Sequence, residues 1–186
     1  MEITINDILK IDLRGKVIIF PTDTVYGIGC LYDDLVAIDR IYHLKNRDYS
    51  KPMAILAADF SSLMPLVEVN EEFMELAKKH WPGALTLVVS KTDLVSKLAS
   101  GSKDTVGVRV PNHDIALELL RRFGPMVVTS LNQSGEAPIV KFEEAKLYEK
   151  KVDYLIDGGD LEGVASTVYD ITNKTVLRQG SLIINE

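Results

Sequence analysis

The side chains best suited to chemistry gather in the run Pro21–Cys30, directly after the apolar segment Val17–Phe20. The run holds two threonines, a carboxylate, a phenol and two glycines. The apolar segment predicts a buried strand, and α/β proteins build ligand sites just beyond the carboxyl end of such strands. A hydroxyl-capped turn or helix start that binds nothing is the alternative interpretation.

A basic cluster, Lys45 and Arg47 with Lys51 close behind, follows the helix predicted at residues 34–46. Cations in the last turn of a helix complement its dipole, which explains the cluster without any ligand. The alternative is an anion clamp, because the cluster precedes a predicted strand and could lie at the rim of the sheet. Both interpretations stay open on the sequence.

The segment Thr105–Val110 alternates in the manner of a half-buried strand. Its three valines share the face that goes to the core, and Thr105, Gly107 and Arg109 share the other. Arg109 could form a structural salt bridge. Alternatively, Gly107 makes room for a ligand whose carboxylate or phosphate takes two hydrogen bonds from the guanidinium.

Two further segments place hydroxyls at a strand end. A buried strand leads directly into Ser130 and Asn132, which are two residues apart and can point the same way. They suit either a Ser or Asx turn, or the binding of phosphate oxygens or metal-bound water. Residues 163–170 repeat the pattern, and Arg178 lies in the next predicted strand.

Several common catalytic patterns are missing from the sequence. It contains neither a phosphate-binding loop nor a dinucleotide fingerprint. The three histidines are scattered, and no nucleophile elbow occurs. The available groups therefore bind anions and hydroxyls, no side chain is an obvious nucleophile, and we expect no metal site built from protein side chains.

The elements that must position these groups are short. Strands are predicted at Val17–Phe20, Met53–Ala57, Leu85–Val89, Thr105–Val110, Met126–Thr129, Val152–Ile156, Ser166–Ile171 and Thr175–Leu177, and helices at Asp34–Asn46, Asn70–Trp81 and Asn112–Phe123. The predicted cap residues of these helices are Asp33 or Asp34, Asn70 and Asn112. The order does not alternate strictly, which favours an α/β (α+β) domain with a mixed, twisted sheet and packed helices. No linker interrupts the chain, so we expect one domain over residues 1–186.

Composition narrows the class of protein. The chain has 186 residues and a net charge of −6, with 21 basic and 27 acidic residues. This balance argues against a protein whose main role is gripping nucleic acid. One cysteine excludes an intrachain disulfide. With no signal peptide or membrane span in the sequence, a cytoplasmic protein without membrane contact is expected.

Eight short blocks occur in order along the chain: Pro21–Gly29, Lys45-x-Arg47, Lys51-Pro52, Trp81–Leu87, Val108–Pro111, Ser130-x-Asn132 with Ser134-Gly135, Ser166–Val168 and Leu177–Gly180. Together they resemble the threonylcarbamoyl-AMP synthase family, the YrdC/Sua5-type proteins, from about residue 10 to the C-terminus. The length resembles the short, single-domain form. The resemblance implies a YrdC-like (DHBP synthase-like) fold with a central basic cavity.

The resemblance also implies an ATP-dependent reaction of L-threonine with bicarbonate or CO2. Its products are threonylcarbamoyl-AMP and pyrophosphate. A tRNA-modifying threonylcarbamoyl transferase complex would accept the intermediate, for the adenosine next to the tRNA anticodon. Direct tRNA binding by this chain would be weak, and the implied cofactor is Mg2+ carried by ATP near Ser130 and Asn132.

Site residues follow from the same resemblance. The catalytic group would be Lys45, Arg47, Ser130 and Asn132, which also contact ATP together with Thr105, Pro138 and Arg178. Threonine would be held by Thr22, Arg109 and Ser166, with Arg109 on its carboxylate. Asp114 and the loop after Gly135 depart from the family pattern.

Two rival functions stay open. The same basic cavity could serve a non-catalytic module that binds double-stranded RNA or tRNA, although the acidic total and the lack of aromatic stacking platforms disfavour it. Carbamoyl-adenylate handling within a larger maturation enzyme is the other, and this chain lacks the additional domains for it.

Overall fold

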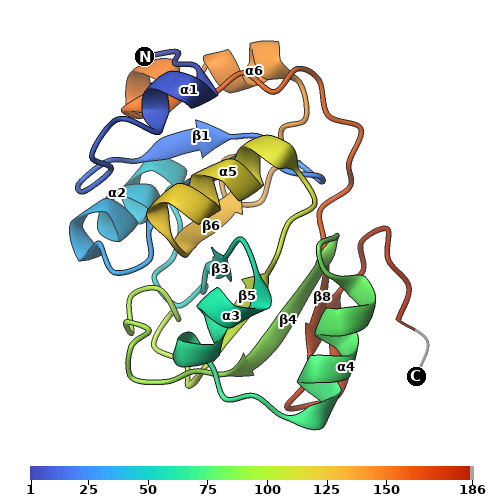
Figure 1. The fold of residues 1–186 in the computed structure, drawn as a ribbon. Helices are drawn as coiled ribbons and strands as arrows, with labels where there is room; N and C mark the ends of the chain where they lie inside the picture. Colours follow the sequence, from blue (N-terminus) through green and yellow to red (C-terminus); the bar gives the residue numbers. More distant parts are fainter. Residues whose placement is uncertain (185–186) are drawn as a thin grey trace.

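A computed structural model describes residues 1–184 (Figure 1). The α-helices are α1 (Ile5–Ile8), α2 (Leu35–Lys45), α3 (Phe60–Leu63), α4 (Glu71–His80), α5 (Asp114–Phe123) and α6 (Phe142–Lys146). The strands are β1 (Ile18–Phe20), β2 (Gly27–Leu31), β3 (Ala54–Leu56), β4 (Leu85–Ser90), β5 (Thr105–Arg109), β6 (Met126–Ser130), β7 (Tyr154–Leu155), β8 (Thr167–Asp170) and β9 (Thr175–Arg178). Two 3-10 turns lie at Met64–Leu66 and Glu149–Lys151.

The strands form one mixed sheet in the order β7-β1-β2-β6-β3-β5-β4-β8-β9. Parallel pairs join β1 to β7, β3 to β5 and β4 to β8, and the other neighbours are antiparallel. This confirms the mixed sheet predicted from the irregular order of elements. Within residues 1–184, no helix has the length and apolar character needed to cross a bilayer.

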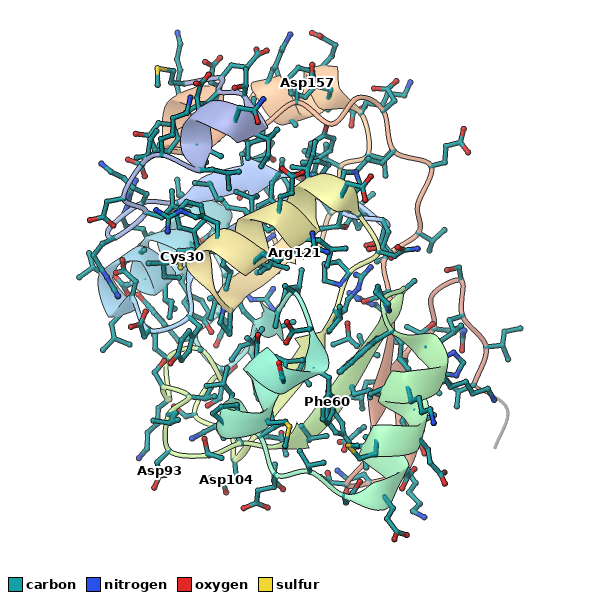
Figure 2. All side chains as sticks on the ribbon, viewed as in Figure 1. Cys30, Phe60, Asp93, Asp104, Arg121 and Asp157 are labelled. Carbon is teal, nitrogen blue, oxygen red and sulfur yellow. The ribbon has the colours of Figure 1, made fainter. Side chains whose placement is uncertain are left out.

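Strand alternation divides the apolar side chains between two cores. The larger core takes Ile19, Ile55 and Val127 from the sheet, together with residues of α2, α4 and α6. The smaller core takes the alternate positions, such as Ile18 and Leu56, and is covered by α1 and α5. Charged side chains such as Asp93, Asp104 and Asp157 project from the outside of the molecule (Figure 2). The sheet is therefore covered by helices on both faces.

Helix ends test the capping predictions. Asp34 and Asn70 cap α2 and α4 through side-chain oxygens that accept bonds from the backbone N–H groups three residues on. Asn112 does not cap α5, because that helix begins at Asp114, with His113 at the cap position and no side-chain cap bond. The Asn112 prediction was wrong by one residue.

The principal error of the sequence-based assignment lies at β2. The run Pro21–Cys30 was interpreted as a turn, but residues 27–31 form a buried strand paired with both β1 and β6. The glycines serve close packing there, since a Cβ at Gly29 would lie 2.7 Å from the carbonyl oxygen of Val127. Gly27 and Gly29 were read as turn formers because both roles use the same residue type.

Candidate functional site

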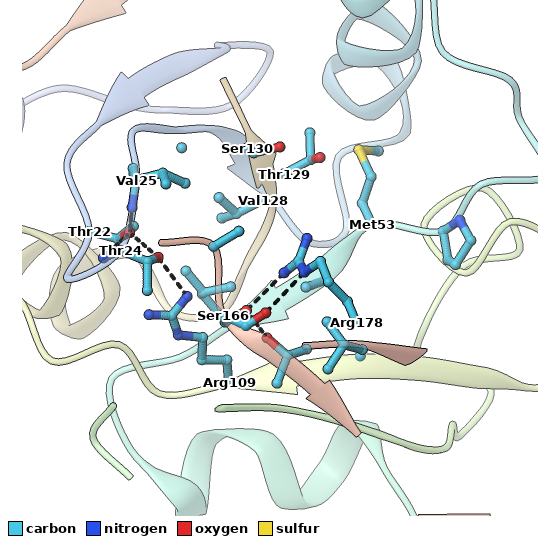
Figure 3. Close-up of a pocket in the computed structure, with 18 of the residues that line it drawn as sticks. Thr22, Thr24, Val25, Met53, Arg109, Val128, Thr129, Ser130, Ser166 and Arg178 are labelled. Atoms are coloured by element: carbon cyan, nitrogen blue, oxygen red, sulfur yellow. Dashed lines mark hydrogen bonds between the residues drawn. The ribbon is translucent and has the colours of Figure 1, made fainter. Parts of the chain in front are cut away.

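A pocket of about 260 Å³ opens on the face of the sheet that carries the smaller core. In the described chain, that core takes no residue from β4, β5, β8 or β9, and the pocket covers this half of the face and extends to β2, β3 and β6. The charged side chains in its lining are Arg47, Arg109 and Arg178, and it also carries six hydroxyls, from Thr22, Thr24, Thr86, Thr129, Ser130 and Ser166 (Figure 3). The described lining contains no acidic side chain.

Arg109 ends β5 with its side chain only 6% exposed, on the strand face opposite the buried valines, as the alternation predicted. Its guanidinium donates to the carbonyl of Gly83 at 2.9 Å, to Thr24 Oγ1 at 3.0 Å and to Asp23 Oδ1 at 2.6 Å. Burial lowers the pKa of Arg109, and the charge of Asp23 opposes that shift. The structural salt bridge is therefore present, and two of the five N–H groups have no partner among the described residues.

The run after β1 presents Thr24 to Arg109, and it uses Thr22 internally. The hydroxyl of Thr22 donates to the carbonyl of Val25 at 2.7 Å and accepts from the backbone N–H groups of Thr24 and Val25. Its single proton is thus used inside the turn. Thr24 Oγ1 accepts from Arg109, and its own proton goes either to Thr22, 3.0 Å away, or to a ligand. Both hydroxyls line the pocket, but Thr24 has the proton to offer.

Ser166 and Arg178 meet on the other side of the pocket. Arg178 donates from Nε to the carbonyl of Ser166 at 2.9 Å and from a terminal nitrogen to Ser166 Oγ at 3.0 Å. Within the described chain, Arg178 forms no ion pair with a carboxylate. Burial, together with the like charge of Arg109, lowers the pKa of Arg178. Arg109 and Arg178 therefore line the same cavity, and Arg178 lacks, in the described chain, a counter-ion of the kind that Asp23 gives Arg109.

Lys45 lies outside the pocket lining, although the sequence suggested either a surface cap or a phosphate clamp. The residue is 2% exposed, and its ammonium donates to the carbonyls of Ser130 and Asn132 and to Asn132 Oδ1. Burial and the charge of Arg47 lower the pKa of Lys45 to about 7. All three N–H donors are used, so in this conformation Lys45 holds the loop after β6 rather than the pocket.

Arg47 and Ser130 reach the pocket, and Asn132 does not. Arg47 is held by the carbonyls of Lys51 and Pro52, at 3.1 and 2.8 Å. Ser130 donates to Asn132 Oδ1 at 2.9 Å, which ties the strand end to its own loop. The hydrogen bond from Lys45 to Asn132 joins this loop to the end of α2.

Thr105 and Pro138 are not in the pocket lining. Thr105 starts β5, pairs with Ser90 and lies at the opposite end of the strand from Arg109. The predicted ATP contacts of both residues stay predictions. In residues 1–184, no group of three or more His, Cys, Asp or Glu side chains could hold a metal ion.

Sequence reasoning gave no role to three residues that shape the site: Asp23, Thr24 and Thr86. Asp23 and Thr24 stood in the run that attracted attention, but the choice among its polar groups requires their hydrogen bonds. Thr86 had a usable signal, because it is the one polar residue within Leu85–Val89 and strand alternation sets it apart from Leu85 and Leu87.

Comparison with known proteins gives consistent results. The model of the Sua5/YciO/YrdC family, described as "Telomere recombination", matches residues 11–180. A Pyrococcus abyssi protein named threonylcarbamoyl-AMP synthase is 41% identical over 93% of this chain and 53% of its own length. A Vibrio campbellii protein of the same name is 31% identical over 94% of this chain and 98% of its own.

A solved structure extends the comparison to three dimensions. The crystal structure of Pyrococcus abyssi Sua5 complexed with L-threonine matches with a TM-score of 0.91 and 38% identity, over 96% of this chain and 54% of that one. The chain thus spans about half of the length of the Pyrococcus proteins that it matches.

Proposed function

The chain belongs to the Sua5/YciO/YrdC family, and on that premise we propose that it is an L-threonylcarbamoyladenylate synthase. Its substrates are L-threonine, bicarbonate or CO2, and ATP, and its products are threonylcarbamoyl-AMP and pyrophosphate. The observation that carries the proposal is the pocket, where three arginines and six hydroxyls line one cavity without an acidic side chain. A Pyrococcus protein with this fold is complexed with L-threonine.

The proposed reaction needs two anions side by side. The amine of threonine adds to CO2 and loses a proton, giving a carbamate. A carbamate oxygen then attacks the α-phosphorus of ATP, and pyrophosphate leaves with the electron pair of the broken P–O bond. No covalent intermediate with the protein is required, so this nucleotidyltransferase activity rests on positioning and on stabilising negative charge.

We assign these tasks to two sides of the pocket. Arg109, already neutralised by Asp23, has two free N–H groups for a threonine carboxylate, and Thr24 adds a hydroxyl. Arg47 and Arg178 have no carboxylate partner in the described chain and are suited to the phosphates of ATP. Mg2+ would enter with ATP near Ser130 and Asn132 and supply charge neutralisation on the phosphates.

The proposed product is consumed in tRNA modification. A threonylcarbamoyl transferase complex would take it to the adenosine next to the anticodon, which places the activity in the cytoplasm. Transfer is the task of that complex, so this chain needs no strong RNA surface of its own.

Pyrophosphate release measured with each substrate omitted in turn tests the proposal. Release should require ATP, Mg2+, threonine and bicarbonate together. Tight binding of double-stranded RNA or tRNA with no release of pyrophosphate would support the non-catalytic module instead.

A further inference from the structure

Thr86 lies beside the predicted threonine-binding residue Ser166 and has no assigned role. It belongs to β4, is 5% exposed and lines the pocket. Its Oγ1 lies 2.8 Å from Ser166 Oγ, and the two hydroxyls form a chain with Arg178, shown by dashed lines in Figure 3. Apart from these contacts, neither hydroxyl has a hydrogen-bond partner among residues 1–184.

The donors and acceptors in the hydrogen-bonded series Thr86–Ser166–Arg178 can be counted. Arg178 can only donate, so Ser166 Oγ must accept from it. The two hydroxyls carry two protons, and the bond between them uses one. The other proton has no acceptor in the described protein, and both residues line the pocket. If Thr86 donates to Ser166, the Ser166 hydroxyl keeps its proton for an acceptor atom of a ligand, and if Ser166 donates to Thr86, the Thr86 hydroxyl keeps it.

The backbone of β5 holds Thr86 in place. A Cβ at Gly107 would lie 3.1 Å from Thr86 Cγ2, closer than nearly all real Cβ contacts. Gly107 therefore makes room for the methyl group of Thr86. With the methyl over Gly107 and the hydroxyl on Ser166, the side chain is restrained at two points.

We propose that Thr86 is a positioning residue that acts through Ser166. Thr86 donates to Ser166 Oγ and so fixes the direction of the Ser166 hydroxyl, which donates one hydrogen bond to a carboxylate oxygen of the amino-acid substrate. The positive charge of Arg178 on the same oxygen strengthens Ser166 as a donor. This inference rests on the proposed synthase activity and names a residue that helps the pocket hold the carboxylate of its amino acid.

The test compares Thr86→Val, which keeps the methyl group and removes the hydroxyl, with Thr86→Ser, which does the reverse. Steady-state pyrophosphate release gives KM for threonine and for ATP separately. Thr86→Val should raise the threonine KM about threefold to tenfold, as expected for one neutral hydrogen bond, with the ATP KM within about twofold. Thr86→Ser should keep the threonine KM close to that of wild type.

Two further variants isolate the effect. Thr92→Val removes a hydroxyl that donates to the carbonyl of Pro65 just beyond β4, outside the pocket lining, and should leave both KM values unchanged. In a Ser166→Ala background, Thr86→Val should add less than about twofold, because its route to the substrate is gone. If Thr86→Val does not fold, Thr86→Ala carries the same expectation.

Each contrary outcome has its own meaning. A threonine KM within twofold of wild type in Thr86→Val, or equal damage in Thr86→Ser, overturns the role of the hydroxyl while the synthase stands. If Thr86→Val raises the threonine KM by the same factor in the Ser166→Ala background as in wild type, Thr86 does not act through Ser166. Wild-type protein that releases no pyrophosphate overturns the proposed function, and this inference with it.

Discussion

Replacement of Asp23 by asparagine should expose how far the pocket depends on one ion pair. The carboxylate lies 2.6 Å from Arg109, and the two side chains are 14% and 6% exposed. Asp23→Asn keeps an oxygen at the position that Arg109 contacts and removes the charge. Arg109 would then be a buried cation without a counter-ion.

The size of the effect follows from that burial. Breaking a buried pair by removing one partner costs about 3–5 kcal/mol, and the retained acceptor favours the lower end. For a chain of this length, 1 kcal/mol corresponds to about 2–4 °C in melting temperature. Asp23→Asn should therefore melt about 6–12 °C below wild type.

A matched exposed pair controls for loss of charge alone. Arg14 and Asp33 form a two-pronged contact at 2.9 and 3.2 Å with side chains 55% and 48% exposed. Asp33→Asn should lower the melting temperature much less than Asp23→Asn does, because solvent screens an exposed pair.

Differential scanning calorimetry with and without threonine completes the test. In Asp23→Asn a bound threonine carboxylate would replace the missing counter-charge, so threonine should raise the melting temperature of the variant at least as much as that of wild type. Coupling between Asp23→Asn and Arg109→Met in a double-mutant cycle should be on the order of 2 kcal/mol. The reasoning fails if Asp23→Asn melts within about 2 °C of wild type, or if coupling is below about 0.5 kcal/mol.

Three other predictions concern the rest of the site. Lys45 has a pKa lowered to about 7 in the folded protein and an ordinary value near 10.5 when unfolded, so between these pH values the native state binds fewer protons than the unfolded state. The unfolding free energy of wild type relative to Lys45→Met should therefore rise from pH 7 to pH 10. If urea titrations show no change of this difference with pH, the carbonyls keep Lys45 charged. Arg47→Ala should weaken ATP binding about 30- to 150-fold by calorimetric titration, as for one charge-assisted contact, with Lys51→Ala as the control, and equal losses in both would point to general charge. Thr22→Val should mainly lower the melting temperature and Thr24→Val mainly threonine affinity, since the Thr22 proton is used inside its turn; the reverse pattern would contradict the hydrogen-bond assignment.

Local sequence patterns were sufficient to predict many of the helices and strands. The caps at Asp34 and Asn70 and the valine face of β5 were predictable, because capping and alternation depend on residues near in sequence. The short helices α1, α3 and α6 were missed, because segments of four or five residues are too short to show a helical period. The strand β2 was missed because its glycines are needed for close packing against β6, which is distant in sequence.

The structure brings some of the predicted site residues into one pocket and leaves others outside its lining. Arg109, Ser166 and Arg178 line one pocket, because Arg109 ends β5, Ser166 directly precedes β8 and Arg178 ends β9, and β4 joins β5 to β8 in the sheet. Lys45 looked like either a cap or a clamp, and it is instead buried against the carbonyls after β6. Nothing in residues 45–47 could indicate that partner.

Residue types along the chain predicted a site of arginines and hydroxyls suited to anions, a mixed sheet, and the family that the chain resembles. These properties depend on composition and on spacing within a segment. Which hydroxyl keeps a free proton, which arginine already has a counter-ion and which lysine is buried depend on hydrogen bonds between segments up to 87 residues apart. Because such bonds form only when the sheet brings β1, β4, β5 and β8 together, the chain folded in three dimensions settles them.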